Sequence, residues 1–191
     1  MKNFLMAIVA ALLLLTTTAH AETYFRQGNH YCELGEYELA IQCYDMSLLL
    51  EPVVDDAAKY RNRGDANAEL RQYWQAIDDY NQAIRLAPNY VEAYNNRGVT
   101  YIDLRQYEQA IQDLNKAIQI KPNYSHPYNN RGVAYRKLGL NDLAIADFEK
   151  ALEIDPNHTH ARKNLGRSSS DIDEINALNA LFGIKITSPK E

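Results

Sequence analysis

Three glycines, Gly64, Gly98 and Gly132, recur at a spacing of 34 residues, and each follows the dipeptide Asn-Arg. Prolines keep the same spacing downstream of them, at Pro88, Pro122 and Pro156. A fixed period of this length is typical of arrays in which each supersecondary unit buries its apolar face against the next unit. The sequence therefore predicts a repeat array, which favours a binding scaffold over a catalytic fold.

Many neighbouring positions recur with the glycines. They include Tyr60, Tyr94 and Tyr128 before them, and Ala76, Ala110 and Ala144, then Ala83, Ala117 and Ala151, after them. A worn copy aligns on Gly28, with two extra residues in the connection that follows Pro52. Added loop length costs little closure entropy, so such an insertion is tolerated. With four units of this kind, the chain resembles the tetratricopeptide repeat family.

The resemblance covers about residues 21–166 and implies an all-α fold, a right-handed α-solenoid of helix-turn-helix repeats with a C-terminal capping helix. The expected units are 22–56 (divergent), 57–90, 91–124 and 125–158, followed by capping helices and a tail over 159–191. Within a unit, Gly98 and Ala110 should lie where two helices cross, because axes about 8–10 Å apart leave little room for side chains.

The first 21 residues differ in character from the repeats. Lys2 precedes an apolar run from Phe4 to Leu15, and Ala19-His20-Ala21 provides a small-residue cleavage signal. This pattern predicts a secretory signal peptide over 1–21. A membrane anchor is the alternative, but twelve apolar residues are fewer than the about 20 that span a bilayer. We therefore expect a bacterial periplasmic or secreted protein with no stable membrane insertion after cleavage.

Charge and motif content exclude several function classes. The formal net charge is −5, and the sequence lacks the large basic excess that nucleic-acid binding requires. It also lacks a phosphate-binding glycine loop, paired zinc-type cysteines and a nucleophile elbow. His126, His158 and His160 could form a weak metal site, although solvated histidines at loops and helix ends are commoner. The sequence therefore predicts neither an enzyme nor a cofactor nor a metal.

Arginine precedes each repeat glycine, where the family usually has an apolar residue. A partly buried charge must be paired, and an aspartate follows each glycine by fifteen residues. Antiparallel helices should bring the two together, and in the first unit both change, to Gln27 and Cys43. We therefore predict structural ion pairs within units: Arg63 with Asp79, Arg97 with Asp113, and Arg131 with Asp147.

Cys32 and Cys43 could form a disulfide in an oxidising compartment. Cys32 should lie four residues along the helix from the point opposite Cys43, which is roughly 6 Å of helical rise. A disulfide requires closer Cβ atoms, so the spacing disfavours the bridge.

The resemblance implies a groove lined by the first helix of each unit. Asn62, Asn96, Asn130 and Asn164 form a ladder along it at the repeat period. Amides both donate and accept, so such a ladder could hold a peptide backbone or serve packing. Further expected groove residues are Asn95, Val99, Ile102, Asn129, Val133, Arg136 and Lys137.

Acidic residues predominate at the first part of this groove and basic residues at its far end. The resemblance implies a noncatalytic scaffold or adaptor that binds an extended peptide or a partner helix. The charge gradient predicts a ligand that is basic toward the first end of the groove and acidic toward its last. Phe25, Glu92 and Asn96 replace the cationic members of the family's carboxylate clamp, which disfavours chaperone tails as ligands. The alternatives are a self-assembling structural envelope protein and, less favoured, a small metal-binding protein or enzyme. The identity of the partner is not predicted.

The C-terminal segment has a helical apolar stripe that consists of Ile172, Ile175, Leu178, Leu181 and Phe182. The end of a solenoid exposes apolar surface that needs a cover, so we expect this segment to cap the array. It could instead occupy the groove or pair with a second copy to form a homodimer.

Overall fold

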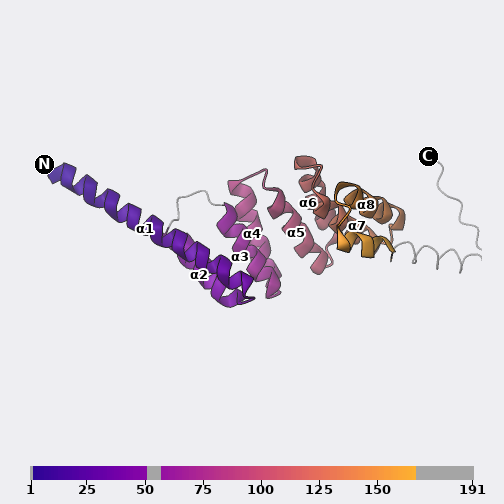
Figure 1. Ribbon diagram of the computed structural model, residues 1–191, viewed down its shortest axis with the longest axis horizontal. Helices are drawn as coiled ribbons and strands as arrows, with labels where there is room; N and C mark the ends of the chain where they lie inside the picture. Colours follow the sequence, from indigo (N-terminus) through magenta and orange to yellow (C-terminus); the bar gives the residue numbers. More distant parts are fainter. Residues whose placement is uncertain (1, 51–56, 167–191) are drawn as a thin grey trace, which may run out of the picture. The chain divides into compact units, whose positions relative to one another are not determined.

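The computed structural model describes residues 2–50 and 57–166, with side chains from residue 17 onward. Over these ranges the chain forms helices and turns and no strand (Figure 1). The helices are α1 (Lys2–Glu33), α2 (Tyr37–Leu50), α3 (Ala57–Glu69), α4 (Tyr73–Leu86), α5 (Val91–Asp103), α6 (Tyr107–Ile120), α7 (Ser125–Lys137) and α8 (Asn141–Ile154). Residues 159–166 are also helical. The predicted all-α helix-turn-helix solenoid class is therefore confirmed.

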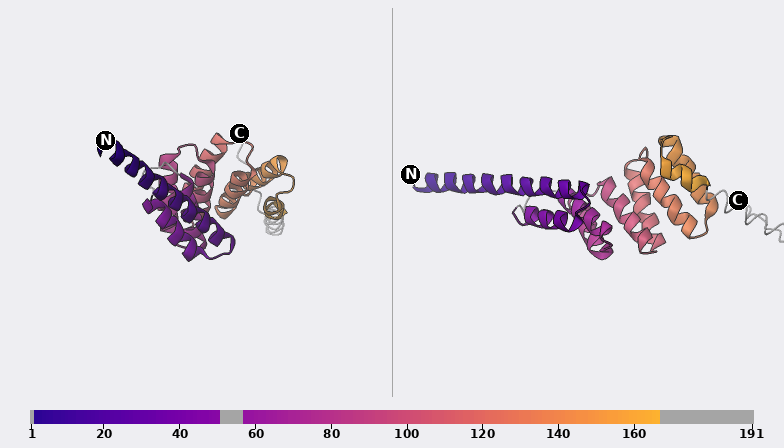
Figure 2. Two further views of the ribbon diagram at one scale, coloured as in Figure 1. Left: turned by 60° about the vertical axis from the view of Figure 1, so that its left-hand side comes forward. Right: turned by 60° about the horizontal axis from the view of Figure 1, so that its bottom comes forward.

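The chain divides into two compact units, Met1–Thr100 and Tyr101–Glu191, and the boundary falls inside α5. In the first unit α1 packs on α2, α3 on α4, and α2 on α3. In the second, α7 packs on α8 and α6 on α7. Figure 2 shows the hairpins formed by these neighbouring helices. Each unit thus builds its core from consecutive helices.

A left-handed residue ends the first helix of every repeat. Gly35 and Gly139 both have φ of 76°, while Arg71 has 59° and Arg105 has 60°. In the second repeat, Arg71 N–H donates to the Ala68 carbonyl and Gln72 N–H to the Asn67 carbonyl, at 2.9 and 2.8 Å. This pair of bonds is the Schellman motif, which satisfies carbonyls at the end of a helix. The turn geometry is therefore common to all four repeats, although two of them lack the usual glycine.

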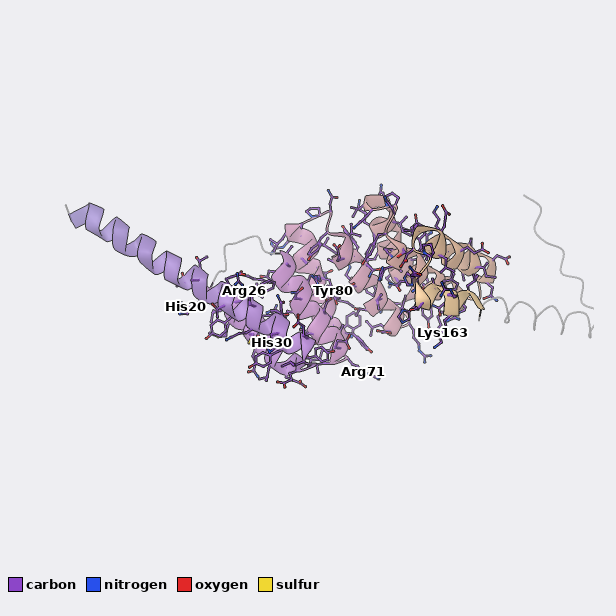
Figure 3. The ribbon with its side chains drawn as sticks, viewed as in Figure 1. His20, Arg26, His30, Arg71, Tyr80 and Lys163 are labelled. Carbon is purple, nitrogen blue, oxygen red and sulfur yellow. The ribbon has the colours of Figure 1, made fainter. Side chains whose placement is uncertain are left out.

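The repeat glycines lie where the two helices of a hairpin cross. A Cβ atom added to Gly132 would lie 2.6 Å from a Phe148 ring carbon, and one added to Gly64 would lie 2.8 Å from a Tyr80 ring carbon. The ring fills the space that the missing side chain leaves; Tyr80 is labelled in Figure 3. On the facing helix, Ala40, Ala76, Ala110 and Ala144 are fully buried. The small residues of the repeat pattern are thus required by close helix packing.

Helix α1 continues through the expected end of the signal peptide. Ala21 is fully buried, and its carbonyl accepts a hydrogen bond of 2.8 Å from the hydroxyl of the buried Ser47. Ala21 occupies the same repeat position as Ala57, Val91 and Ser125, which are also buried. The boundary between residues 1–21 and the first repeat therefore falls inside a helix, and cleavage there stays a prediction. The expected C-terminal cap lies outside the described residues.

Candidate functional site

Arginine side chains join helices within and between repeats. In the second repeat, Arg63 donates to both oxygens of Asp79, with Nη2 2.6 Å from Oδ1 and Nε 3.0 Å from Oδ2. Its other terminal nitrogen, Nη1, donates to Asp45 of the preceding repeat at 2.6 Å. In the fourth repeat, Arg131 donates hydrogen bonds to both oxygens of Asp147, at 2.7 and 2.8 Å. Two of the three predicted pairs are thus brought together.

Arg97 and Asp113 belong to different units, so their pairing stays a prediction. Arg97 donates a hydrogen bond to Asn81 of the preceding repeat. Arg131 likewise donates to Asn115 of the repeat before it, and this bond is 2.5 Å long. The acceptors Asp45, Asn81 and Asn115 all lie seventeen residues after a repeat glycine. This recurrence is a sequence signal for the links between repeats, and the predicted ion pairs do not include these links.

Burial determines the electrostatics of these pairs. The Asp79 side chain is 5% exposed, and desolvation raises its pKa although the Arg63 guanidinium opposes that shift. For Arg131 the hydrogen bond to Asp147 is the main cause of a raised pKa. The guanidinium of Arg131 also lies over the rings of Tyr128 and Tyr135, 5.6 and 5.7 Å from their centroids. Each arginine is therefore part of the structure of its repeat and is not an available ligand group.

The predicted asparagine ladder forms hydrogen bonds between successive repeats. Asn62 donates to Asn29 at 2.7 Å, Asn96 to Asp65 at 2.7 Å, and Asn164 to Asn129 at 3.0 Å. Asn95 and Asn129 are buried, and each donates to the next residue, Asn96 or Asn130, at 3.0 Å. At least one amide function of each ladder residue therefore serves packing, which was one of the two predicted roles.

A cavity of about 190 Å³ lies beside this ladder in the first unit. It is lined by Asn29, Cys32, Tyr44, Arg61, Asn62 and Asp65, so the first helices α1 and α3 supply five of its six residues. Tyr44 donates to Asn29 at 2.9 Å, and Arg61 pairs with Asp65 at 2.9 Å. The carbonyl oxygen Oδ1 of Asn62 is buried and has no hydrogen-bond partner among the residues that the structure describes. The cavity thus combines a fixed polar network with one unsatisfied acceptor.

Cys32 places its thiol in the lining of this cavity and forms no disulfide with Cys43. Cys32 and Cys43 are both free. Cys32 Sγ lies 3.4 Å from the Tyr44 hydroxyl, and burial raises the pKa of the Cys32 thiol. A raised pKa keeps the thiol protonated and unreactive at neutral pH.

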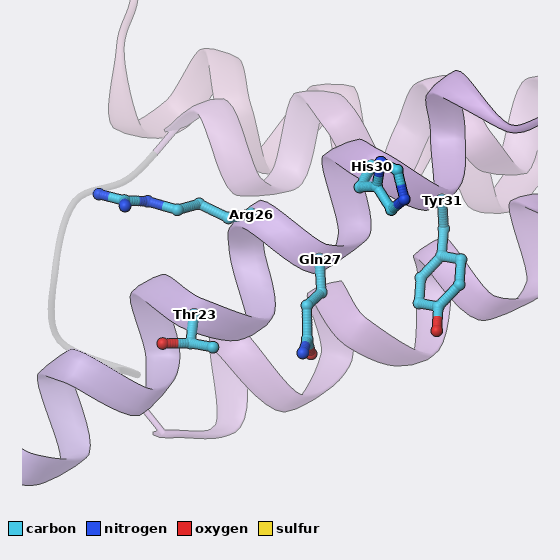
Figure 4. Close-up of a pocket in the computed structure, with 5 residues that line it drawn as sticks. All are labelled: Thr23, Arg26, Gln27, His30 and Tyr31. Carbon is cyan, nitrogen blue, oxygen red and sulfur yellow. The ribbon is translucent and has the colours of Figure 1, made fainter.

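A larger cavity, about 510 Å³, lies along α1. Its lining residues are Thr23, Arg26, Gln27, His30 and Tyr31 (Figure 4). The positions equivalent to Thr23, His30 and Tyr31 in the second repeat are buried, at Lys59, Ala66 and Asn67. In the later repeats this face packs against the preceding repeat. The cavity therefore lies on the face of the first repeat against which no described repeat packs. Gln27 on this face occupies the position that Arg63, Arg97 and Arg131 have in the later repeats.

The remaining predicted groove residues lie mostly on α5 and α7. Val99 and Val133 are half-buried, and Ile102 packs against the core cluster around Leu114. Arg136 is half-buried and Lys137 is exposed at the end of α7. These residues are placed on first helices of the repeats, as the family resemblance implies.

His126 on α7 and His158 and His160 after α8 place their rings close together in tilted and edge-on contacts. His126 lies 4.9 Å from His158, and His158 lies 6.3 Å from His160, between ring centroids. Among the described residues, no group of three His, Cys, Asp or Glu side chains could hold a metal ion. His158 Nδ1 accepts a backbone hydrogen bond, so this nitrogen is not free to bind a metal.

No helix is both long and apolar enough to cross a membrane in the part of the chain with described side chains.

Comparison with known families and structures gives consistent matches. A model of the tetratricopeptide repeat matches residues 21–52, 91–124 and 127–158, and a second repeat model of this type matches residues 64–104. A crystal structure of MamA is 32% identical, covers 71% of this chain and 78% of that chain, and has a TM-score of 0.66. No curated protein matches the sequence.

Two other solved structures extend the comparison. The first TPR domain of Spaghetti (RPAP3), bound to an HSP90 peptide SRMEEVD, is 27% identical, covers 61% of this chain and 93% of that chain, and has a TM-score of 0.59. MamA from residue 41 to its end, from Desulfovibrio magneticus RS-1, is 22% identical, covers 86% of this chain and 92% of that chain, and has a TM-score of 0.71. At that identity the second likeness shows the fold alone.

Proposed function

The chain belongs to the tetratricopeptide repeat family, and from this premise we propose that it is a noncatalytic scaffold for protein-protein interaction. Its ligand is an extended segment of a partner protein, bound against the first helices of the repeats. The cavity beside Asn62 carries this proposal, because first helices supply most of its lining and this lining contains amide, hydroxyl and charged groups. The N–H and C=O groups of a peptide backbone can exchange hydrogen bonds with side chains of these kinds.

Peptide-bound structures in the family support this proposal. The RPAP3 domain that holds SRMEEVD is similar to this chain, as is the second TPR domain of human RPAP3 in complex with an HSP70 peptide SGPTIEEVD, at 28% identity. Both peptides have acidic C-terminal ends. This chain has Phe25, Glu92 and Asn96 where clamp members of the family have cations, so we do not propose such tails as its ligands.

The charged residues suggest the polarity of the partner segment. Asp65 in the cavity is already paired with Arg61 at 2.9 Å, whereas α7 ends with the half-buried Arg136 and the exposed Lys137. Opposite charges across an interface favour association and set its orientation. The partner segment is therefore acidic where it meets α7.

We also propose that the protein is exported. Lys2, the apolar run and the Ala-His-Ala sequence support a signal peptide, and such a signal directs a bacterial protein to the periplasm or the medium. In that location the scaffold could serve as an adaptor in envelope assembly. Sequencing the N-terminus of the protein purified from its native envelope tests export and processing together.

A photo-crosslinking amino acid at Val133 tests the scaffold proposal in the cell that makes the protein. Gln109, which is exposed on α6, provides the matched control position. One partner should crosslink from Val133 and not from Gln109. Equal crosslinking from both positions would mean that the first helices do not form the binding surface.

Charge reversal then tests the polarity. Arg136→Glu with Lys137→Glu should weaken binding of that partner at least about tenfold, or about 1.4 kcal/mol. Lys116→Glu with Lys150→Glu makes the same change in net charge on second helices and should leave binding intact. If both pairs weaken binding equally, net charge rather than the site on α7 determines the affinity.

An exposed apolar stripe on α2 favours self-assembly as a second candidate function. Leu39, Met46 and Leu49 lie on one side of the helix and are 40%, 38% and 70% exposed. Later repeats have mainly polar residues at these positions, such as Gln75, Lys116 and Arg85. Contiguous exposed apolar surface often marks an interaction site, so the stripe supports contact with a second copy.

A further inference from the structure

His158 begins the last described helix of the chain. Residues 156–157 form a turn and residues 159–166 are helical, which places His158 at the N-cap position. Its Nδ1 atom accepts the backbone N–H of Ala161, three residues later, at 3.3 Å. This is the geometry of a side-chain N-cap, which satisfies one of the free N–H groups of the first turn.

The cap requires one protonation state of the imidazole. Nδ1 can accept a hydrogen bond only while it carries no proton, so the proton of neutral His158 lies on Nε2. Nε2 is buried and has no hydrogen-bond partner in the described part of the chain. An imidazolium would direct a second N–H at the Ala161 N–H and would lie against the positive end of the helix. Protonation therefore removes the cap.

The surroundings of His158 also disfavour a positive charge. The residue is 7% exposed, and the facing ionisable groups are His126 on α7, Asp155 in the turn after α8, and His160 on its own helix. Burial is the main cause of a lowered pKa of His158, and His126 and His160 lower it further, while Asp155 opposes them. The His126 ring, 4.9 Å away, is itself stacked on Tyr124 at 5.0 Å. The structure thus holds a neutral imidazole.

The capped helix holds the last rung of the asparagine ladder. Asn164 donates to Asn129 of α7 at 3.0 Å. Ala161 is fully buried in the cluster with Tyr128 and Ala151. Loss of the first turn of this helix would therefore separate Asn164 from Asn129 and Ala161 from Tyr128.

We propose that His158 is an acid-sensitive cap whose protonation releases residues 159–166 from α7. Release separates Asn164 from Asn129 and opens this end of the second unit. The device operates whether or not a peptide binds at the first helices. If the proposed groove is correct, acid also removes its last rung.

The direction with pH follows from the lowered pKa. The closed state binds fewer protons than the open state, so acid favours opening. The contribution of neutral His158 to the closed state is fully present above the ordinary histidine pKa of about 6.5. Below that value the opening equilibrium rises by up to about tenfold per pH unit, the limit for one linked proton.

Hydrogen exchange of the full chain tests the proposal between pH 7.5 and pH 5. After correction for intrinsic exchange rates, a peptide covering residues 159–166 should exchange up to about tenfold faster per pH unit below 6.5. His158→Asn keeps a capping side chain that does not titrate, so its exchange should not vary with pH. His160→Asn removes an exposed histidine of the same helix and should keep the wild-type acid response.

Two results would overturn the inference. One is an acid response that persists in His158→Asn, and the other is a wild-type segment whose corrected exchange is constant. An NMR titration of the His158 ring gives a second measurement that does not depend on opening rates. In His126→Gln the midpoint should move to higher pH, and an unchanged midpoint would also contradict the proposed histidine coupling.

Discussion

At the residue scale, the tightest constraint is the contact between a repeat glycine and the ring on the facing helix. We predict that Gly132→Ala destabilises the protein by about 1–3 kcal/mol, because the new methyl group requires the Phe148 ring to move within a packed core. Thermal or urea unfolding measures this loss. Gly166→Ala is the control, since a Cβ there has no atom within 4 Å among the described residues, apart from its chain neighbours and the backbone of its own helix, and it should not destabilise. Equal losses in the two variants would mean that the crossing is not tightly packed.

A second residue-scale prediction concerns the pair between Arg131 and Asp147. Their side chains are only 19% and 8% exposed, and two charge-assisted hydrogen bonds join them. A double-mutant cycle with Arg131→Ala and Asp147→Ala should therefore give a coupling of about 1–3 kcal/mol. The exposed pair of Lys150 with Glu153 should show no measurable coupling. If the losses of stability from the two single substitutions were simply additive, the pairing of Arg131 with Asp147 would not stabilise the protein.

At the element scale, the turn between the two helices of a repeat is the weakest match between residue and conformation. Arg71 adopts φ of 59°, a left-handed conformation that costs a side chain about 1–2 kcal/mol. Arg71→Gly should therefore stabilise the protein, by about 0.5 kcal/mol once the greater entropy of glycine in the unfolded chain is included.

The urea midpoint should rise while the slope of the transition stays constant. Glu69→Gly, at the last residue of α3, should lower the midpoint instead, because glycine loses more conformational entropy than glutamate when it adopts a helical conformation. A loss of stability in both variants would show that the Arg71 side chain contributes more than its conformation costs.

The elements also show which features the sequence could predict. The hairpins and the pairs of Arg63 with Asp79 and Arg131 with Asp147 depend on counting along two antiparallel helices, which the repeat period allows. The link from Arg63 to Asp45 depends on how one repeat stacks on the next, which counting within a unit does not provide. The positive φ of Arg71 has no residue signal, because arginine is not a left-handed turn residue. Burial of Asn95 likewise follows from packing between repeats.

At the scale of the whole molecule, the C-terminal segment is predicted to cover the end of the array. Deletion of residues 171–191 should lower the midpoint of thermal unfolding by several degrees if the segment contributes roughly 1 kcal/mol or more. An unchanged midpoint with tighter binding of the crosslinked partner would instead indicate occupation of the groove. Conversion of a dimer to a monomer, measured by light scattering, would indicate pairing of two copies through this segment.

Self-association through the exposed apolar stripe of α2 distinguishes the two candidate functions. The wild-type protein should show a mass that rises with concentration in sedimentation experiments. Leu39→Gln, Met46→Lys and Leu49→Arg together place residues of the later repeats on α2 and should keep the protein monomeric. The exposed Leu138, Leu140 and Leu143 of the second unit allow a matched triple change to Gln, which should leave association intact. If the wild type is monomeric at every concentration, α2 is not a self-assembly surface. If the α2 variant is monomeric but still crosslinks its partner from Val133, ligand binding and self-assembly use different helices.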